Sequence, residues 1–305
     1  MKKDIVRSLP FFGRKKHSTS GDTYKGFHEY PLLSDLFSID KLERHGESMA
    51  RVHVLDYRKR PDKLLSRLTE NENILKDIYV TLTDEEKSKQ SLPPAGIWLL
   101  DNFYLISEQI LTARNHLSKG YSRTLPRLGT GSAAGLPRVY DIVQELISHV
   151  DGRIDEGNLR GIVDGYQRVT SLTLGELWAI PIMLRLALIE NLRRVSMRIM
   201  ESWSDSKRAG VWADRMIATI GVAPQNIILD MADMARANIP QTSAFVSEMV
   251  RRLQSQSGAL RLPLTWIEQR LAEEGTSIEA QVQTERKHQA INQISISNSI
   301  GSLRL

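Results

Sequence analysis

The longest apolar stretch of the chain, LTLGELWAIPIMLRLALIENLRR (residues 172–194), limits what this sequence can fold into. Every residue from Leu177 to Ile189 is apolar except Arg185. As a helix this run extends about 20 Å, whereas a membrane span needs about 20 residues to cross roughly 30 Å of hydrocarbon. A helix that is apolar on all sides belongs instead in the core of a large helical protein. The stretch therefore predicts a central buried helix over about residues 173–200.

Three residues define the expected behaviour of this helix. Thr173 and Glu176 form a T-x-x-E capping box, which predicts the helix start. Pro181 has no N–H to donate to the preceding turn, so we expect a kink there. If Arg185 is buried, its charge needs a carboxylate or carbonyl partner from another helix.

Helical periodicity continues through most of the remaining chain. In GIWLLDNFYLISEQILTARNHL (residues 96–117), apolar residues recur at the spacing of one helix face. Further helices are expected at about residues 40–54, 62–82, 137–150, 155–169, 207–220, 223–237, 241–256, 262–274 and 277–300. The sequence has no sustained alternation of apolar and polar residues, the pattern that would predict strands. The expected fold class is all-α, a multi-helix bundle around the central, apolar, Pro-kinked helix.

One segment predicts a division of the bundle. Residues 118–137 are rich in Gly, Ser and Pro and are long for a helix–helix connection. We interpret them as a linker between an N-terminal helical lobe (31–117) and a C-terminal helical lobe (138–305). Because the final residues, SISNSIGSLRL, remain apolar without a polar closure, we expect the second lobe to be truncated at its end. An exposed apolar surface would follow.

Composition excludes some chemistry and locates the charge. The chain has no cysteine, which removes disulfides, thiol catalysis and cysteine-ligated metal sites. The net charge of +5 is carried by residues 1–20, and the rest of the chain is balanced. We expect residues 1–30 to be a basic, disordered arm without a secretory signal pattern. A basic arm could contact anionic lipid or nucleic acid. We expect an anionic membrane surface, through residues 1–20, and no nucleic-acid partner.

Two arrangements of residues could suggest catalysis, but each is better explained as a feature without a catalytic role. Asp101 and Glu108 share a predicted helix, about 10.5 Å apart along its axis. Glycosidase carboxylates lie about 5–5.5 Å or about 6.5–9.5 Å apart, so a solvated polar face is the better interpretation. The segment GTGSAAG (residues 129–135) lacks a preceding strand and the G-K-[ST] ending of a phosphate loop. We interpret it as a flexible connection.

Histidines and tryptophans offer no recognisable site in the sequence. The histidines form no H-E-x-x-H motif and no i, i+4 pair among themselves; they are His17, His28, His45, His53, His116, His149 and His288. No catalytic, cofactor-binding or metal-ligating residue is predicted, and no cofactor. Tryptophans could stack on sugars, but we expect Trp98 and Trp178 in the core and Trp203 and Trp212 at the surface.

Three stretches carry a family resemblance: residues 96–110 (GIWLLDNFYLISEQI), 135–155 (GLPRVYDIVQELISHVDGRID) and 172–194. With residues 120–128 (GYSRTLPRL) between the first two, they resemble the N-terminal region of cyclic β-1,2-glucan synthases. The resemblance extends over about residues 30–305. It implies a large bacterial inner-membrane enzyme that transfers glucose from UDP-glucose, with a phosphorylase-like C-terminal part.

This chain departs from the family's catalytic pattern. It has no D-x-D motif and no Q-x-x-R-W motif of a processive glycosyltransferase. No family catalytic residue can therefore be transferred to it, and we expect the chain alone to be inactive. The resemblance implies a non-catalytic helical module at the cytoplasmic face of the bacterial inner membrane. Its partners would be the remaining domains of a glucan synthase, another protein, or a second copy of the chain.

Two other functions stay open at this level. The chain could be a free-standing helical protein for interaction or regulation, derived from that module. It could also be an enzyme with an unrecognised site near residues 118–137, which would show convergent titratable groups with shifted pKa values.

The basic arm should be dispensable for folding. Residues 1–20 carry the net charge but no helical apolar pattern, so their deletion should leave helicity and Tm nearly unchanged by circular dichroism. If the arm binds anionic vesicles, sedimentation with them should fall on deletion and with added salt, because salt screens exposed charges. Vesicle association that is insensitive to both changes would refute the membrane-surface hypothesis.

Overall fold

A computed structural model describes residues 35–58, 61–117, 120–237, 239–254 and 261–304. Within these residues the chain forms α-helices, two short 3-10 helices and a pair of two-residue strands. The all-α fold class predicted from the sequence is confirmed. The basic arm predicted for residues 1–30 lies outside the described residues.

The elements follow in chain order. The α-helices are α1 (Ile39–Val52), α2 (Leu64–Lys87), α3 (Pro94–Asp101), α4 (Phe103–His116), α5 (Arg138–His149), α6 (Glu156–Gln167), α7 (Leu174–Val222), α8 (Ile227–Arg236), α9 (Ser243–Leu253), α10 (Arg261–Glu273) and α11 (Ile278–Ser302). The 3-10 helices are η2 (Tyr121–Thr124) and η3 (Pro224–Asn226). Strands β1 (Leu55–Asp56) and β2 (Arg127–Leu128) pair antiparallel.

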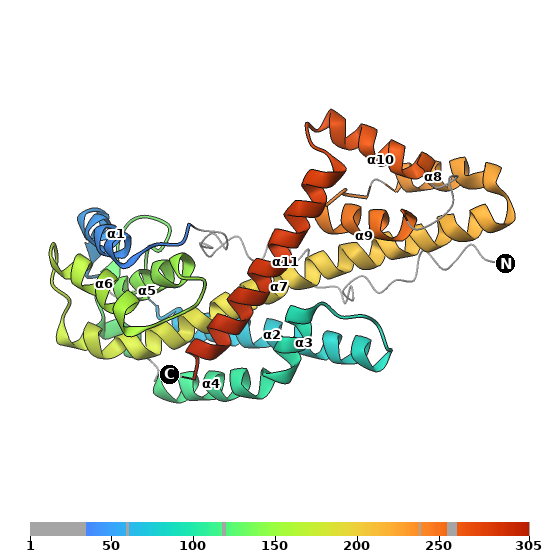
Figure 1. The fold of residues 1–305 in the computed structure, drawn as a ribbon. Helices are drawn as coiled ribbons and strands as arrows, with labels where there is room; N and C mark the ends of the chain where they lie inside the picture. Colours follow the sequence, from blue (N-terminus) through green and yellow to red (C-terminus); the bar gives the residue numbers. More distant parts are fainter. Residues whose placement is uncertain (1–34, 59–60, 118–119, 238, 255–260, 305) are drawn as a thin grey trace.

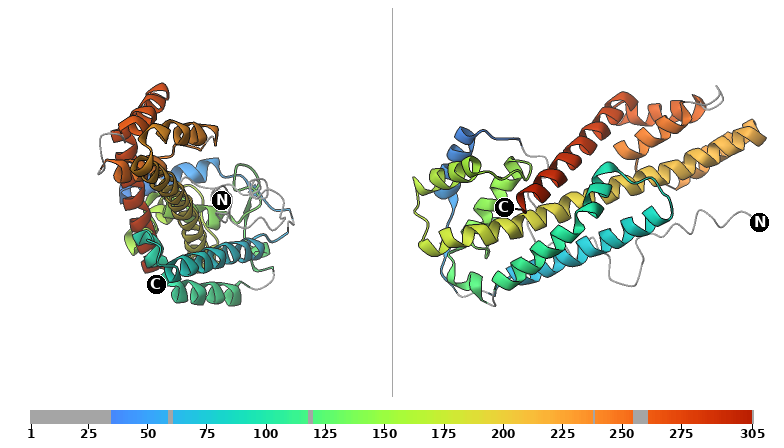
Figure 2. Two further views of the ribbon diagram at one scale, coloured as in Figure 1. Left: turned by 90° about the vertical axis from the view of Figure 1, so that its right-hand side faces the viewer. Right: turned by 60° about the horizontal axis from the view of Figure 1, so that its bottom comes forward.

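Helix α7 is the axis of the molecule. It extends diagonally through the fold in Figure 1, with α1, α5 and α6 gathered near its N-terminal end and α8, α9 and α10 near its C-terminal end. Helices α2, α3 and α4 lie along one side of α7, and α11 crosses it on another (Figure 2). Packing of this kind buries most of the apolar run of α7, as the sequence predicted, but leaves Trp178 and Pro181 exposed.

The predicted details of α7 are largely confirmed. Thr173 and Glu176 form the capping box: the Glu176 amide donates to Thr173 Oγ1, and the Thr173 amide donates to Glu176 Oε2. Arg185 is half-buried, and its Nε donates to the amide oxygen of Gln109 on α4, 2.7 Å away. The helix continues through Pro181, and the kink expected there stays a prediction.

Two predicted helix boundaries are wrong. The helices expected at 173–200 and 207–220 are a single helix of 49 residues. Polar residues between them do not form a turn because they find partners on other elements; Ser202, for example, donates to Glu285 of α11. Conversely, the helix expected over residues 96–117 divides at Asn102, which ends α3 and whose side-chain amide donates to the Trp98 carbonyl.

The buried apolar residues form two clusters. The first gathers the N-terminal part of α7 with α1 to α6 and the end of α11. The second joins the C-terminal part of α7, from Ala209 to Met216, with α8, α9 and α10. The first cluster draws on residues both before and after 118–137, so the two lobes predicted to meet there share one apolar core. The division into two lobes stays a prediction.

The described part of the predicted linker, residues 120–137, is hydrogen-bonded to neighbouring elements. Arg127 is buried and donates from Nη1 to the carbonyls of Pro61 and Gly135, at 3.0 and 3.2 Å. Strand β2 comes directly before residues 129–135, where the sequence predicted no strand. Arg127 thus links this segment to the residue range before α2, and the flexibility expected for residues 129–135 stays a prediction.

The exposed apolar surface predicted at the end of the chain is also wrong. Ile296, Ile300 and Leu303 are buried, because α11 packs along α7 and against α3 and α9. The apolar pattern of this ending therefore reflects a helix that is covered on its inner side. No helix in the described parts of the chain is both long enough and apolar enough to cross a membrane.

A charge placed in the core at α7 should unfold the protein. Leu188 is buried in the first cluster, so Leu188→Asp should cost on the order of 4 kcal/mol or more. Leu174 lies on the same helix and is exposed, and Leu174→Asp should change stability by about 0.5 kcal/mol or less. Urea denaturation of both variants measures the difference; equal stabilities would contradict the central position of α7.

Candidate functional site

The candidate site depends on a close contact between α1 and α6. A β-carbon added at Gly165 would lie 2.1 Å from the Glu43 carbonyl oxygen, and one at Gly46 would lie 2.4 Å from the Ile162 carbonyl oxygen. Only glycine lets two helix backbones approach so closely. This contact fixes α1 beside α5 and α6, and it brings histidines of the α1 region against polar side chains of α5.

The first histidine cluster lies in the interior between these helices. His53, which follows α1, has its Nε2 3.1 Å from Oδ2 of Asp141 on α5. Its Nδ1 lies 3.0 Å from the hydroxyl of Tyr166 on α6. The side chains of His53 and Asp141 are largely buried. One hydrogen-bonded chain of side chains therefore connects the three helices.

Burial shifts both titratable groups of this cluster toward their neutral forms. Desolvation, assisted by the charge of Arg138, lowers the pKa of His53 to about 4. Desolvation, assisted by Glu145, raises the pKa of Asp141 to about 7. At mildly acidic pH the pair therefore holds one proton, on the carboxyl group, and the neutral imidazole is its partner.

The second histidine cluster lies nearer the surface. His45 Nε2 is 3.0 Å from Glu145 Oε2, and His149 Nε2 is 3.4 Å from the same oxygen. Phe37 stacks on the His149 ring at 3.7 Å between centroids and meets the His45 ring edge-on at 5.5 Å. The backbone carbonyl of Asp35 lies 2.8 Å from His149 Nδ1. These side chains could hold a metal ion, since one ligand atom from each of His45, Glu145 and His149 lies within 4.8 Å of the others.

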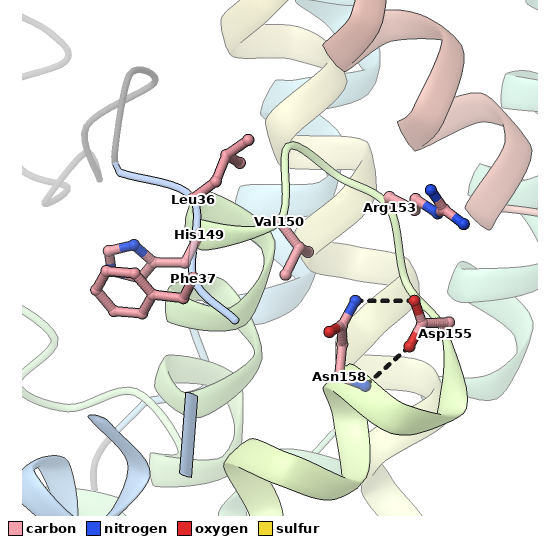
Figure 3. Close-up of a pocket in the computed structure, with 7 residues that line it drawn as sticks. All are labelled: Leu36, Phe37, His149, Val150, Arg153, Asp155 and Asn158. Carbon is pink, nitrogen blue, oxygen red and sulfur yellow. Dashed lines mark hydrogen bonds between the residues drawn. The ribbon is translucent and has the colours of Figure 1, made fainter. Parts of the chain in front are cut away.

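A shallow pocket of about 330 Å³ lies beside the stacked rings. Figure 3 shows the ring of His149 lying over that of Phe37, while Asp155 and Asn158 face each other across two hydrogen bonds on the other side. Arg153 is the basic residue of the lining. The pocket is thus lined by the cation of Arg153, by the carboxylate of Asp155, which is hydrogen-bonded to Asn158, and by the ring of His149.

Neither cluster was predicted from the sequence. The histidines form no i, i+4 pair among themselves, but Glu145 and His149 do have this spacing, which places both on one face of α5. That i, i+4 pair was the available signal. His45 and His53 come from a distant part of the chain, and no local pattern could have predicted that they approach α5.

A third group of buried polar side chains joins the large helices. Glu190 of α7 is 1% exposed and forms a bidentate ion pair with Arg67 of α2. The hydroxyl of Tyr140 on α5 donates to Glu190 at 2.8 Å, and Gln144 donates to that hydroxyl at 2.9 Å. Burial alone would raise the pKa of Glu190, but Arg67 outweighs it and holds that pKa below its usual range. Glu190 follows the apolar stretch directly and was predicted to be its polar boundary, whereas the structure buries it.

The residues considered for catalysis in the sequence lie elsewhere. Asp101 ends α3 and Glu108 lies on α4, so the two are on different helices, and both are exposed. The prediction of a solvated polar face is confirmed for both. Neither belongs to the two histidine clusters.

Three of the tryptophan predictions are wrong. Trp178 is 75% exposed and Trp98 is 42% exposed, although both were expected in the core. Trp212, expected at the surface, is 6% exposed because α8, α9 and α10 cover that part of α7. Trp203 is partly buried, and its indole N–H donates to the Ser91 carbonyl. The apolar pattern near Trp178 does not reveal that the first turns of α7 are covered on only part of their circumference.

Comparison with known proteins gives one informative relative. No protein-family model matches the chain. It is 29% identical over 274 residues to the cyclic beta-(1,2)-glucan synthase NdvB of Rhizobium meliloti (strain 1021). The chain is related to a part of a cyclic β-1,2-glucan synthase.

The match covers very different fractions of the two proteins. The aligned region covers 90% of this chain but only 10% of the synthase. It fits an N-terminal region, and the resemblance predicted from the three sequence stretches is confirmed. Asp141, Glu145, His149 and Glu190 lie within those three stretches, whereas His45, His53 and Tyr166 come from α1, the residues after it and α6.

The His53–Asp141 pair should give a distinctive pH dependence. Between about pH 4 and 6.5 the folded pair holds a proton on Asp141 and the unfolded chain holds one on His53, so their opposite contributions cancel. Asp141→Asn removes the contribution of the Asp141 carboxyl group and leaves that of His53. Because the pKa of His53 stays low in the folded state, stability of the variant should rise with pH from about 4 to 6.5.

The measurement is the free energy of unfolding of the variant minus that of the wild type at each pH. Denaturation with urea between pH 4 and 8 provides it. Because the contribution of His53 is common to both proteins, this difference should rise with pH as the contribution of Asp141 is removed, and a difference that stays flat between pH 4 and 6.5 would contradict the raised pKa of Asp141. His116→Ala, which removes an exposed histidine on α4 outside this cluster, serves as the control variant.

Proposed function

We propose that this chain is a non-catalytic helical module of a cyclic β-1,2-glucan synthase. In this role it supports glucosyl transfer from UDP-glucose that other parts of such a synthase carry out, at the cytoplasmic face of the bacterial inner membrane. The observation that carries the proposal is the match of 90% of the chain to a tenth of the NdvB synthase.

The arrangement of buried charges supports a scaffolding role. Glu190 pairs with Arg67 across α7 and α2, and Glu176 pairs with Arg138 across α7 and α5 at 2.8 Å. These charges are used to join helices to one another. Removing one partner of such a buried pair costs about 3–5 kcal/mol, which suits a body whose helices must keep fixed positions.

Exposed apolar side chains support docking to another protein part. Trp178 and Leu174 lie one turn apart at the start of α7, and both are largely exposed. Tyr104 and Leu111, seven residues apart on α4, are exposed as well. Large exposed aromatic and aliphatic residues are typical of surfaces that become covered by a partner. The same observation favours the second candidate function, a free-standing helical protein that binds another protein.

The purified chain alone should not transfer glucose from UDP-glucose. Transfer needs groups that hold the diphosphate and a base that activates the acceptor hydroxyl. Incubation with radiolabelled UDP-glucose and Mg²⁺ or Mn²⁺ should give no labelled glucan and no labelled protein above a heat-killed control. Metal-dependent incorporation would overturn the non-catalytic role.

A replacement experiment tests the supporting role directly. In the Rhizobium meliloti synthase, the matching tenth would be exchanged for this chain, and membranes would be assayed for cyclic glucan. The wild-type chain should sustain synthesis, whereas the chain carrying Leu188→Asp should not. Equal synthesis by both exchanges, at equal amounts of synthase, would refute the supporting role. Failure of the wild-type exchange together with stable binding to an unrelated protein would favour the interaction protein.

A further inference from the structure

We propose that His45, Glu145 and His149 form a binding site for a divalent transition-metal ion of the zinc type. The site joins α1 to α5 and lies beside the shallow pocket. The proposal does not depend on the proposed function of the chain, since it concerns only these side chains and their surroundings.

The distances between the ligand atoms suit a tetrahedral ion. Zinc–nitrogen and zinc–oxygen bonds of about 2.0–2.1 Å place neighbouring tetrahedral ligands about 3.3 Å apart. His45 Nε2 and His149 Nε2 lie 3.0 and 3.4 Å from Glu145 Oε2. The three ligand atoms all lie within 4.8 Å of one another. The two imidazole nitrogens therefore already lie close to the positions that a tetrahedral ion requires.

The tautomer of His149 is an independent observation that points to a cation. The Asp35 carbonyl oxygen can only accept, so His149 Nδ1 must carry the proton of their 2.8 Å hydrogen bond. In the neutral ring, Nε2 then presents a lone pair toward Glu145 Oε2, which also has only lone pairs. Two acceptors that face each other repel unless a proton or a metal ion lies between them. A backbone carbonyl on the remote nitrogen is also the usual support of a metal-bound histidine.

The surroundings hold the two imidazoles in place. The Phe37 ring stacks on His149 with an interplanar angle of 9° and meets His45 at 75°. The Phe37 amide also donates to the His149 carbonyl at 3.1 Å, so the segment before α1 binds this histidine at its ring and its backbone. These contacts limit rotation of the ligands, and such preorganisation strengthens metal binding.

The donor set selects the class of metal. Two imidazoles and one carboxylate suit Zn²⁺, Cu²⁺ and Ni²⁺ better than Mg²⁺ or Ca²⁺, which prefer oxygen ligands alone. The side chains of His45, Glu145 and His149 are 28%, 24% and 13% exposed. Three protein ligands at a partly open position leave room for a water molecule or an external ligand, unlike a closed structural zinc site.

Metal binding would also clamp the local structure. It would connect the segment at Phe37, helix α1 and helix α5 through one ion. Without the ion, the two histidines contact Glu145 only at 3.0 and 3.4 Å. An ion that binds the folded state alone raises its stability by mass action. At a hundredfold excess over its Kd, Zn²⁺ should therefore raise the Tm of the full chain by about 5 °C.

The test is calorimetric titration of the chelator-treated full chain with Zn²⁺. The wild type should bind one equivalent with a Kd in the micromolar range or below. Glu145→Gln keeps the shape of the side chain, and His45→Ala removes one imidazole; each should weaken binding by about 100-fold or more, beyond the losses typical of outer-shell changes. Co²⁺ bound to the wild type should give the intense visible absorption of a tetrahedral complex.

Controls separate this site from adventitious binding by other histidines. His116→Ala and the double variant His17→Ala/His28→Ala should bind Zn²⁺ like the wild type. Circular dichroism of each variant without metal establishes whether it is folded. If His45→Ala is unfolded, the comparison of Glu145→Gln with the wild type decides the test. Absence of Zn²⁺ binding by the wild type would overturn the proposal. So would one equivalent bound equally well by the wild type and Glu145→Gln.

Discussion

The pairing of Glu190 with Arg67 is the interaction on which the large helices depend. Glu190 lies in the buried N-terminal half of α7, where a carboxylate without a partner could not remain charged. Arg67 brings α2 to it, and the Tyr140 hydroxyl brings α5. Three helices that are far apart in the chain are thus held in one register by a single charge. Apolar packing alone would tolerate small sliding movements that this geometry does not.

A second constraint, of purely steric origin, sets the smaller assembly of α1, α5 and α6. Gly46 and Gly165 let the backbones of α1 and α6 touch. Once α1 is fixed in this way, His45 and His53 must both face α5, one at the surface and one in the interior. The two histidine clusters are therefore consequences of the same helix contact, and the metal site that we propose would reinforce it.

The candidate site was only partly accessible from the sequence. Glu145 and His149 are one helical turn apart, so their common face could be predicted from periodicity alone. The approach of His45 could not, because it depends on glycine contacts between helices that are distant in the sequence. The exposure of Trp178 was missed for the same reason. Whether an apolar residue on α7 is covered depends on which other helices reach that turn.

The sequence by itself determined the class of fold, the central apolar helix with its capping box at Thr173, and the relation to cyclic glucan synthases. These follow from local periodicity and from residue patterns that resemble those of the synthases. Tertiary structure decided that Glu190 is a buried partner, that Ile300 is covered, and that His45 meets Glu145. Burial and pairing are properties of helices in contact, and local sequence carries no record of which helices will meet.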